Sequence, residues 1–343
     1  MSAGVKRALD SSIDPSTRRS YESAQRDFLA WRSLRGLPPF PASPFTTGEV
    51  AEWLVHIAAE GGRAGRTIAT YRSALSTLHA TSAWGASPNP IDNPLIHRVV
   101  AGLQRQLAAA DAQRRAAQPR ADDVSPDLLA WLEPTARGDS PHDIMAWAAA
   151  CVGAYSLARS SELVGSYIHP SRALRVDQVS FYASARERVG LLAPGRCIDD
   201  YELPDHAVIQ LDVAKTAQLA PPPPIVLGAR PAVAALWRWM HLRASLGATG
   251  PLLFQVPGRP ALTMAALCSH LALKCAERGR TAQFTGKSFR RGGASAAVAL
   301  GMPAADAAAA GRWAGPGMLP VYASADAKRI RAAAVNRALE PRL

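Results

Sequence analysis

The first 110 residues repeat apolar side chains at the three-to-four-residue spacing of amphipathic helices. The repeats start after Pro15, at Thr46, at Arg66 and at Pro94, and they predict four helices. Their apolar positions, over the first three helices, are Tyr21, Phe28, Leu29 and Trp31, then Val50, Trp53, Leu54 and Ile57, then Ile68, Tyr71, Leu75 and Leu78. The pattern therefore indicates a helical unit over residues 15–110.

The pattern weakens over residues 111–124, which combine charged side chains and a proline with few large apolar residues. This composition is typical of a linker, although its start is also compatible with a helix. Residues 125–343 then form a second predicted domain, with helices over 125–132, 231–246 and 263–278. The apolar run at 144–158 is too short to cross a membrane and predicts a buried helix.

Residues 206–227 alternate apolar and polar side chains, with Ile209, Leu211 and Val213 at every second position. Apolar residues resume at 225–227, after Lys215 and a run of four prolines at 221–224. Such alternation on both sides of a turn predicts a β-hairpin, here with an unusually long tip that carries Lys215.

The composition describes a chain of 343 residues, 48% of them hydrophobic, which is long enough for two domains with separate cores. No uncharged apolar stretch of about 18 residues occurs, and MSAGVKRALDSS at the N-terminus lacks the apolar segment of a secretion signal. The four cysteines form no Cys-x-x-Cys pair. We therefore expect an intracellular protein with reduced, buried thiols and with no membrane partner, metal or cofactor.

The net charge of +12 is unevenly distributed. Residues 1–120 carry 15 Lys and Arg against 9 Asp and Glu, residues 121–277 carry 13 against 15, and residues 278–343 carry 11 against 3. Two basic regions around a neutral middle indicate two surfaces that hold a polyanion, for which nucleic acid is the natural candidate. A solvated charged face without a ligand is the alternative interpretation.

The candidate chemistry lies in residues 285–323, TGKSFRRGGASAAVALGMPAADAAAAGRWAGPGMLPVYA. Lys287 and Arg290 are three residues apart, so on a helix they point the same way. Two Ala-rich helical runs follow, and Trp313 and Tyr322 come in or near the loop after the second one. Cations that converge on one point, with a tyrosine held on a loop beside them, can together attack a phosphodiester.

This stretch resembles the C-terminal signature of the tyrosine recombinases, the Cre and lambda-integrase family. The family pattern is a His or Lys, an Arg three residues later, then a His or Trp, and finally a nucleophilic Tyr. The chain supplies these types in the same order, as Lys287, Arg290, Trp313 and Tyr322.

Two further segments are similar to family motifs. LARSSEL, at the end of the apolar run, resembles the first Arg box, with Arg159 as the catalytic arginine and Glu162 placed to hold its guanidinium. Without the resemblance, a satisfied ion pair is the better explanation of Arg159 and Glu162. Lys215 resembles the hairpin lysine that enters the minor groove in this family, and its alternative is an exposed turn lysine.

The resemblance implies a mainly α fold. A helical core-binding domain at 15–110 and a linker at 111–124 precede a mixed α/β catalytic domain with a small antiparallel sheet at 125–343, and the two domains form a C-shaped clamp around DNA. The implied partners are double-stranded DNA and a homotetramer on two paired sites, in which the C-terminal helix docks into a neighbour. The protein is then DNA-associated, in the nucleus of a eukaryote or in the cytoplasm and nucleoid of a bacterium.

The implied reaction is cleavage and rejoining of duplex DNA through a 3′-phosphotyrosyl intermediate, without a cofactor. Tyr322 attacks, Arg159 and Arg290 neutralise the phosphate, Trp313 donates an N–H, and Lys215 protonates the leaving oxygen. Lys287 either accepts a proton or only binds phosphate. The DNA-binding candidates are Arg18, Arg19, Arg26, Arg66, Arg72 and Arg105 in the first domain and Arg291 in the second.

Three other functions compete with this interpretation. Gly286-Lys287-Ser288 matches the end of a Walker A loop, but Thr281 stands where that loop needs its first glycine, which argues against a nucleotide triphosphatase. A catalytically silent DNA-binding protein of the same fold and a type IB topoisomerase-like enzyme stay open. The presence of every catalytic residue type argues against the silent protein.

Overall fold

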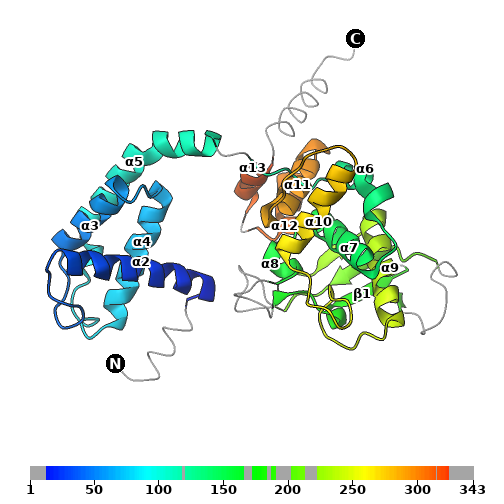
Figure 1. The fold of residues 1–343 in the computed structure, drawn as a ribbon, viewed down its shortest axis with the longest axis horizontal. Helices are drawn as coiled ribbons and strands as arrows, with labels where there is room; N and C mark the ends of the chain where they lie inside the picture. Colours follow the sequence, from blue (N-terminus) through cyan, green and yellow to red (C-terminus); the bar gives the residue numbers. More distant parts are fainter. Residues whose placement is uncertain are drawn as a thin grey trace, which may run out of the picture. The chain divides into compact units, whose positions relative to one another are not determined.

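The computed structural model describes residues 13–117, 120–165, 172–183, 187–190, 202–212, 222–313 and 315–323. The chain divides into two compact units, residues 1–120 and 121–343 (Figure 1). Each unit has its own hydrophobic core.

The first unit contains the four predicted helices, α2 (Pro15–Leu34), α3 (Thr47–Ala59), α4 (Gly65–Thr81) and α5 (Pro94–Ala117), and a short 3-10 helix, η1 (Pro90–Asp92). Local sequence sets their starts: Asp14 caps α2, and Thr46 with Glu49 forms a capping box on α3. Aromatic side chains fill the core, where the Phe28 ring lies edge-on to Trp53 at 5.1 Å and Trp53 stacks on Tyr71 at 5.7 Å.

Two features of this unit go beyond what the sequence pattern decides. Helix α5 continues to Ala117, into the predicted linker, because Asp111 accepts a hydrogen bond from the Gly65 backbone N–H at 2.9 Å and so holds the helix against the start of α4. Arg32 falls among the polar positions of α2 but is only 2% exposed. Its guanidinium is paired with Glu49 at 2.7 Å, which satisfies the charge inside the core.

The second unit is built from eight described helices and a sheet. The helices are α6 (Pro126–Ala136), α7 (Pro141–Tyr155), α8 (Ser160–Leu163), α9 (Arg230–Ser245), α10 (Met264–Glu277), α11 (Gly286–Ala299), α12 (Ala304–Gly311) and α13 (Leu319–Tyr322), with 3-10 turns η3 (Val176–Gln178) and η5 (Pro316–Met318). Helix α7 is the predicted buried helix, and every residue from Ile144 to Ala154 lies in the core. Cys268 and Cys275 on α10 are buried, as expected.

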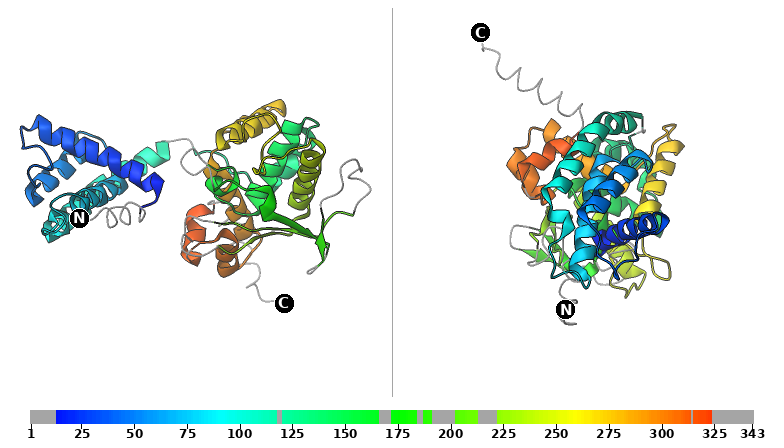
Figure 2. Two further views of the ribbon diagram at one scale, coloured as in Figure 1. Left: turned by 90° about the horizontal axis from the view of Figure 1, so that it is seen from below. Right: turned by 90° about the vertical axis from the view of Figure 1, so that its left-hand side faces the viewer.

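The sheet is antiparallel, with strand order β2-β1-β3-β4. Its strands are β1 (Val179–Tyr182), β2 (Arg188–Val189), β3 (His206–Ile209) and β4 (Ile225–Leu227). The pairing of Ala207 with Leu227 confirms the predicted hairpin. Strands β1 and β2 are too short to give a clear alternation in sequence. Helix α9 covers one face of the sheet (Figure 2). Trp237 on this helix meets Phe181 on β1 edge-on, with ring centres 4.7 Å apart.

The chain is therefore mainly α-helical with one small antiparallel sheet, as the sequence predicts. Lys215 at the hairpin tip and the tail after Ala323 lie outside the described residues. Among the described helices, none is both long and apolar enough to cross a bilayer.

Candidate active site

Three glycines bring α11 into contact with the backbone of its neighbours. A Cβ on Gly292 would lie 2.0 Å from the Val124 carbonyl oxygen, and one on Gly293 would lie 2.4 Å from that of Ala154. At Gly286 a Cβ would lie 2.6 Å from the Ser160 Cβ, at the start of α8. Because only glycine allows such approach, the motif GKSFRRGG fixes α11 beside the Arg159 segment.

Arg290 is buried on α11 and points into the junction between segments that are far apart in sequence. Its Nη1 donates to the Leu157 carbonyl oxygen at 3.0 Å, and its Nη2 donates to that of Gly311. The guanidinium carbon lies 5.0 Å from the centre of the Trp313 ring and 5.3 Å from that of Tyr322. Burial, and then the nearby charge of Arg159, lower the pKa of Arg290, so an anion bound here would relieve an uncompensated cation.

Arg159 and Glu162 form the ion pair that their spacing suggests. Arg159 Nη1 donates to Glu162 Oε1 at 2.6 Å, and the Arg159 backbone N–H donates to Oε2 at 3.0 Å. Glu162 is 1% exposed, and its burial raises the pKa of the carboxyl. Arg312, the backbone N–H of Arg159 and the Arg159 guanidinium outweigh that effect, and the resulting pKa lies below the ordinary value for a glutamate.

Trp313 and Tyr322 stack on each other beside Arg290. Their ring centres are 5.3 Å apart and their planes are 7° from parallel. The indole Nε1 of Trp313 is buried without a hydrogen-bond partner among the described residues. Its N–H can therefore donate to an acceptor that binds in the site. Tyr322 ends the short helix α13, whereas the sequence places it on a loop. Leu319 packs this helix into a small core with Leu157 and Ala294, which the proline-rich local sequence does not reveal.

Arg312 belongs to the same cluster, although the sequence pattern did not indicate it as a site residue. Its Nη2 donates to Glu162 Oε2 at 2.7 Å, and its carbonyl oxygen accepts a bond from Arg159 Nη2 at 3.4 Å. Arg312 ends α12 in the left-handed region, with φ of 51°. Its place in GRW, directly before Trp313 and after an Ala-rich helix, is the only local signal of its role.

The two remaining predicted catalytic residues, Lys287 and Lys215, make no contact with this cluster that the structure describes. Lys287 is exposed in the first turn of α11, three residues before Arg290. Lys215 lies outside the described residues. The structure thus brings together Arg159, Glu162, Arg290, Trp313 and Tyr322, which come from three separate parts of the sequence.

Arg291, a predicted DNA contact, makes several contacts within the second unit. Its Nε donates to Asp123 Oδ1 at 2.7 Å, and its Nη2 donates to the carbonyl oxygens of Ala121 and Asp122. These contacts attach α11 to the segment before α6 and leave the guanidinium 15% exposed. The Arg291 side chain is thus paired with a carboxylate inside the second unit, and its predicted contact with DNA stays a prediction.

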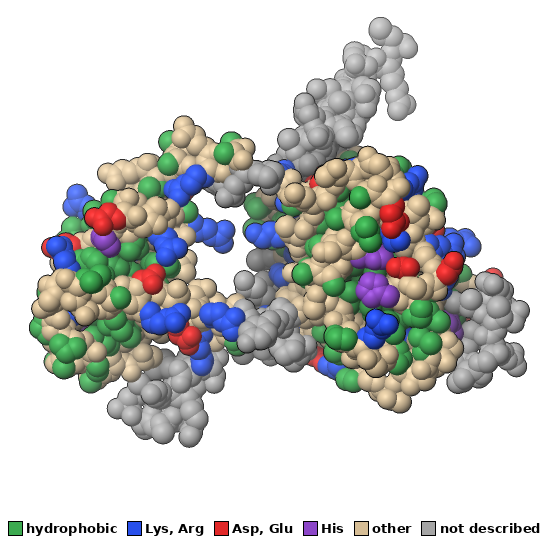
Figure 3. All heavy atoms as spheres, in the orientation of Figure 1, with side chains coloured by type: hydrophobic (Ala, Val, Ile, Leu, Met, Phe, Trp, Pro, Cys, Tyr) green, Lys and Arg blue, Asp and Glu red, His purple; other side chains and the backbone are tan. Residues whose placement is uncertain are grey.

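The other predicted DNA contacts lie on the first unit. Arg19, Arg26, Arg66 and Arg105 are exposed there, whereas Arg18 and Arg72 are half-buried. Figure 3 shows Lys and Arg side chains spread over the visible face of this unit, with fewer acidic side chains among them. Arg19 and Arg66 line one groove between α2 and α4 together with four hydroxyl side chains, Ser20, Ser23, Thr67 and Thr70. Guanidinium and hydroxyl groups are typical phosphate contacts.

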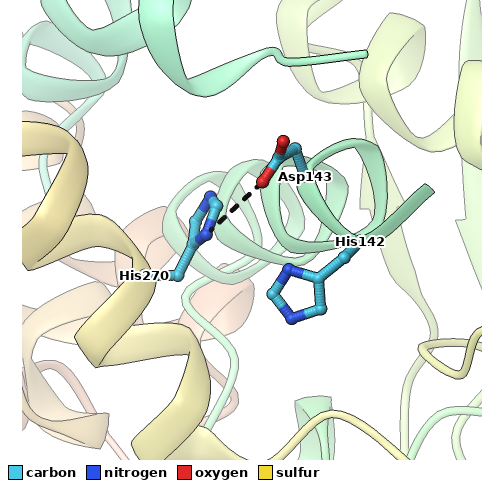
Figure 4. A group of neighbouring side chains, drawn as sticks. All are labelled: His142, Asp143 and His270. Carbon is cyan, nitrogen blue, oxygen red and sulfur yellow. Dashed lines mark ion pairs between the residues drawn. The ribbon is translucent and has the colours of Figure 1, made fainter. Parts of the chain in front are cut away.

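His142, Asp143 and His270 form the one group of metal-ligand types within the described residues (Figure 4). His142 and Asp143 lie in the first turn of α7 and His270 lies on α10, with its Nδ1 3.8 Å from Asp143 Oδ1. The ligand atoms all lie within 4.8 Å of one another. The positive end of α7 and the charge of Lys274 near His270 both oppose a cation, so we assign no metal to this group.

No protein-family model matches the chain, and no curated protein matches its sequence. Solved structures do match. XerH site-specific recombinase bound to the palindromic difH substrate is 14% identical with a TM-score of 0.57, and the match covers 92% of this chain and 78% of that one. This chain has the tyrosine-recombinase fold.

Two other structures with the tyrosine-recombinase fold match over nearly the whole chain. A lambda integrase dimer bound to a COC′ core site is 16% identical with a TM-score of 0.51, and the match covers 93% of each chain. The Tn1549 transposon integrase in complex with transposon right end DNA is 13% identical, with the same TM-score of 0.51 and the same 93% coverage of both chains. At this level of identity the likeness concerns the fold, and the chemistry must be argued from the residues of this chain.

Proposed function

We propose that this protein is a tyrosine recombinase, a site-specific enzyme that cleaves and rejoins duplex DNA through a 3′-phosphotyrosyl intermediate. One observation carries the proposal: the Arg290 guanidinium lies 5.0 Å from the Trp313 ring and 5.3 Å from the Tyr322 ring. Burial, and then the nearby charge of Arg159, lower the pKa of Arg290. Two cations and a phenol at one point, from segments more than a hundred residues apart, suit a phosphodiester better than they suit packing.

The proposed reaction is an in-line displacement at phosphorus. The Tyr322 oxygen forms the new bond to phosphorus, the bond to the 5′ oxygen breaks, and that oxygen takes a proton from Lys215. Arg159 and Arg290 neutralise the two non-bridging oxygens, and the Trp313 Nε1–H donates to one of them. The phosphotyrosyl bond keeps the energy of the broken phosphodiester, so the reverse attack by a 5′ hydroxyl rejoins the strand without ATP.

Lys287 has two possible roles in this scheme. It accepts the phenol proton if it is neutral when the substrate binds. If it stays charged it contacts the phosphate, and the phenol proton passes to solvent. Glu162 does not react and holds the Arg159 guanidinium through its 2.6 Å contact.

The test is covalent trapping. Purified protein is incubated with fragmented host genomic DNA that carries nicks, so that cleavage next to a nick releases a short end and cannot be reversed. We expect an adduct that survives denaturation, that is absent with Tyr322→Phe, and whose DNA ends share one sequence. Sequencing those ends gives the target site.

Other results would favour the competing functions. DNA binding without any adduct would mean a catalytically silent protein of the same fold. An adduct without shared sequence, together with relaxation of supercoiled plasmid by a monomer, would mean a topoisomerase-like enzyme.

We further propose that the protein acts as a homotetramer on two paired sites, with residues 325–343 docked into the neighbouring subunit. The amphipathic pattern of that segment, with Ile330, Ala334 and Leu339 on one side, supports this proposal. Deleting residues 325–343 should leave DNA binding and lose synaptic complexes in native gels, and an unchanged tetramer would contradict it.

A further inference from the structure

Arg312 connects the segment that carries the proposed nucleophile to the Arg159 box. Its side chain crosses to Glu162, 150 residues earlier in sequence, and its carbonyl oxygen accepts from Arg159. The side chain is only 4% exposed. The side chain and the backbone carbonyl of Arg312 therefore both contact the Arg159–Glu162 pair.

The backbone of Arg312 adds a second, independent sign of function. Among the described residues, Arg312 and Leu157 are the only non-glycine residues with a positive φ, at 51° and 53°. This conformation crowds Cβ against the carbonyl group, so the surroundings must hold it in place. Both residues lie in this site, and the Leu157 carbonyl oxygen is an acceptor for Arg290.

The contacts divide the Glu162 carboxylate between two guanidinium groups. Oε1 accepts from Arg159, whereas Oε2 accepts from Arg312 and from the Arg159 backbone N–H. An arginine and a carboxylate left to themselves prefer a bidentate pair in which both oxygens meet both prongs of the fork. Arg312, together with the Arg159 backbone N–H, holds Oε2 away from that arrangement, so most N–H groups of Arg159 stay available.

We propose that Arg312 is a positioning residue. It keeps Glu162 from pairing with both prongs of the Arg159 guanidinium, so that the Arg159 guanidinium stays free to bind the scissile phosphate. This inference rests on the proposed function, because it needs a phosphate at Arg159. It assigns Arg312 no contact with DNA.

Two variants separate the side chain of Arg312 from its backbone. Arg312→Gly removes the guanidinium and fits the left-handed backbone better than arginine does, so the turn itself is kept. Arg312→Lys keeps a cation near Glu162 but offers no planar fork. The readout is single-turnover cleavage of a nicked duplex that carries the site recovered from the wild-type adduct.

We expect Arg312→Gly to cleave about 10²-fold more slowly than wild type, as misplacement of a catalytic group by about 1 Å does. Arg312→Lys should fall between the two. The deciding variant is Arg312→Gly combined with Glu162→Gln, because a neutral amide has no charge with which to capture Arg159. The double variant should cleave faster than Arg312→Gly alone.

Arg243→Ala is the matched control for loss of a buried arginine. Arg243 is 5% exposed, donates to the carbonyl oxygens of Ala248 and Gly250, and lies outside the site. This variant should lower the melting temperature and still cleave like wild type at temperatures below it.

The outcomes can be told apart. A wild-type protein that forms no adduct overturns the proposed function and this inference with it. A wild-type protein that cleaves, together with Arg312→Gly at the same rate, overturns the inference alone. A double variant as slow as Arg312→Gly, or slower, would overturn the inference, because removing the carboxylate charge would then restore nothing.

Discussion

Glu162 is the one buried carboxylate among the described residues, and it shows how single side chains organise the site. Its two oxygens accept from two guanidinium groups and one backbone N–H. Desolvation of a charged carboxylate is costly unless each oxygen is paired, and here each one is. Glu162 therefore stabilises the fold only while it stays ionised.

This gives a prediction for pH. The folded pKa of Glu162 is below its unfolded value, so its stabilising effect is complete above the unfolded pKa of about 4.3 and is lost as pH falls through the folded pKa. At pH 7, Glu162→Gln should lower the free energy of unfolding by about 3–5 kcal/mol, because it leaves Arg312 without its partner. Urea unfolding at pH 6 and pH 3 should show this difference shrinking at the lower pH.

A matched control is Glu52→Gln, which breaks an exposed pair with Arg35 and should cost at most about 1 kcal/mol. A difference between wild type and Glu162→Gln that does not change with pH would contradict the assignment of charge to Glu162.

Lys287 gives a second prediction at the scale of one residue. It is exposed, so Lys287→Ala should change the free energy of unfolding by less than about 0.5 kcal/mol. Cleavage should nevertheless fall about 10²- to 10⁴-fold if Lys287 moves a proton, and Lys287→His should retain it. The measurement is the rate of adduct formation on nicked duplex. Equal rates for wild type and Lys287→Ala would remove Lys287 from the mechanism.

At the scale of elements, α11 determines where the catalytic groups meet. Its glycines allow backbone contact with the segment before α6 and with α7, and this contact aims Arg290 at Leu157 and Gly311. Helices α12 and α13 pack against α11 and so bring Trp313 and Tyr322 next to it. The site thus depends on close approach of α11 more than on any loop.

We therefore predict opposite effects for two helical glycines. Gly292→Ala would place Cβ 2.0 Å from the Val124 carbonyl oxygen and should lower the free energy of unfolding by roughly 1–3 kcal/mol. Gly102→Ala on α5 meets open space and should raise it by about 0.5–1 kcal/mol. Urea unfolding measures both. Gly292→Ala as stable as wild type would mean that α11 can move away without cost.

At the scale of the whole molecule, the charge distribution suggests that DNA-backbone binding and cleavage belong to different units. The first 120 residues form a helical unit with a net charge of +6, and the predicted catalytic residues all lie in the second unit. We propose that the first unit supplies most of the phosphate-backbone contacts, because Arg26, Arg66 and Arg105 are exposed on it.

Replacing Arg26, Arg66 and Arg105 together by Ala should weaken binding to a short duplex of arbitrary sequence. The slope of log affinity against log salt should fall by roughly 0.9 for each phosphate contact that is lost. Fluorescence anisotropy over a salt series measures both quantities. Arg35→Ala is the control, because Glu52 already neutralises Arg35 at 2.9 Å. A triple variant with an unchanged slope would place the DNA surface elsewhere.

The sequence by itself determined the features that depend on spacing along the chain. The long helices of both units, the alternation in the hairpin strands and the Arg159–Glu162 pair follow from neighbours a few residues apart. The order of Lys287, Arg290, Trp313 and Tyr322 is also a property of the sequence alone. Periodicity and capping act over such short distances, so they can be read directly.

Only the tertiary structure decided which side chains meet across long separations. It attached Arg291 to Asp123, buried Arg32 against Glu49, and joined Arg312 to Glu162. It also showed that Tyr322 ends a short packed helix and that α5 continues through the start of the predicted linker. The charge of an arginine is the same in every context, but whether it faces solvent or a buried carboxylate depends on which helices pack together.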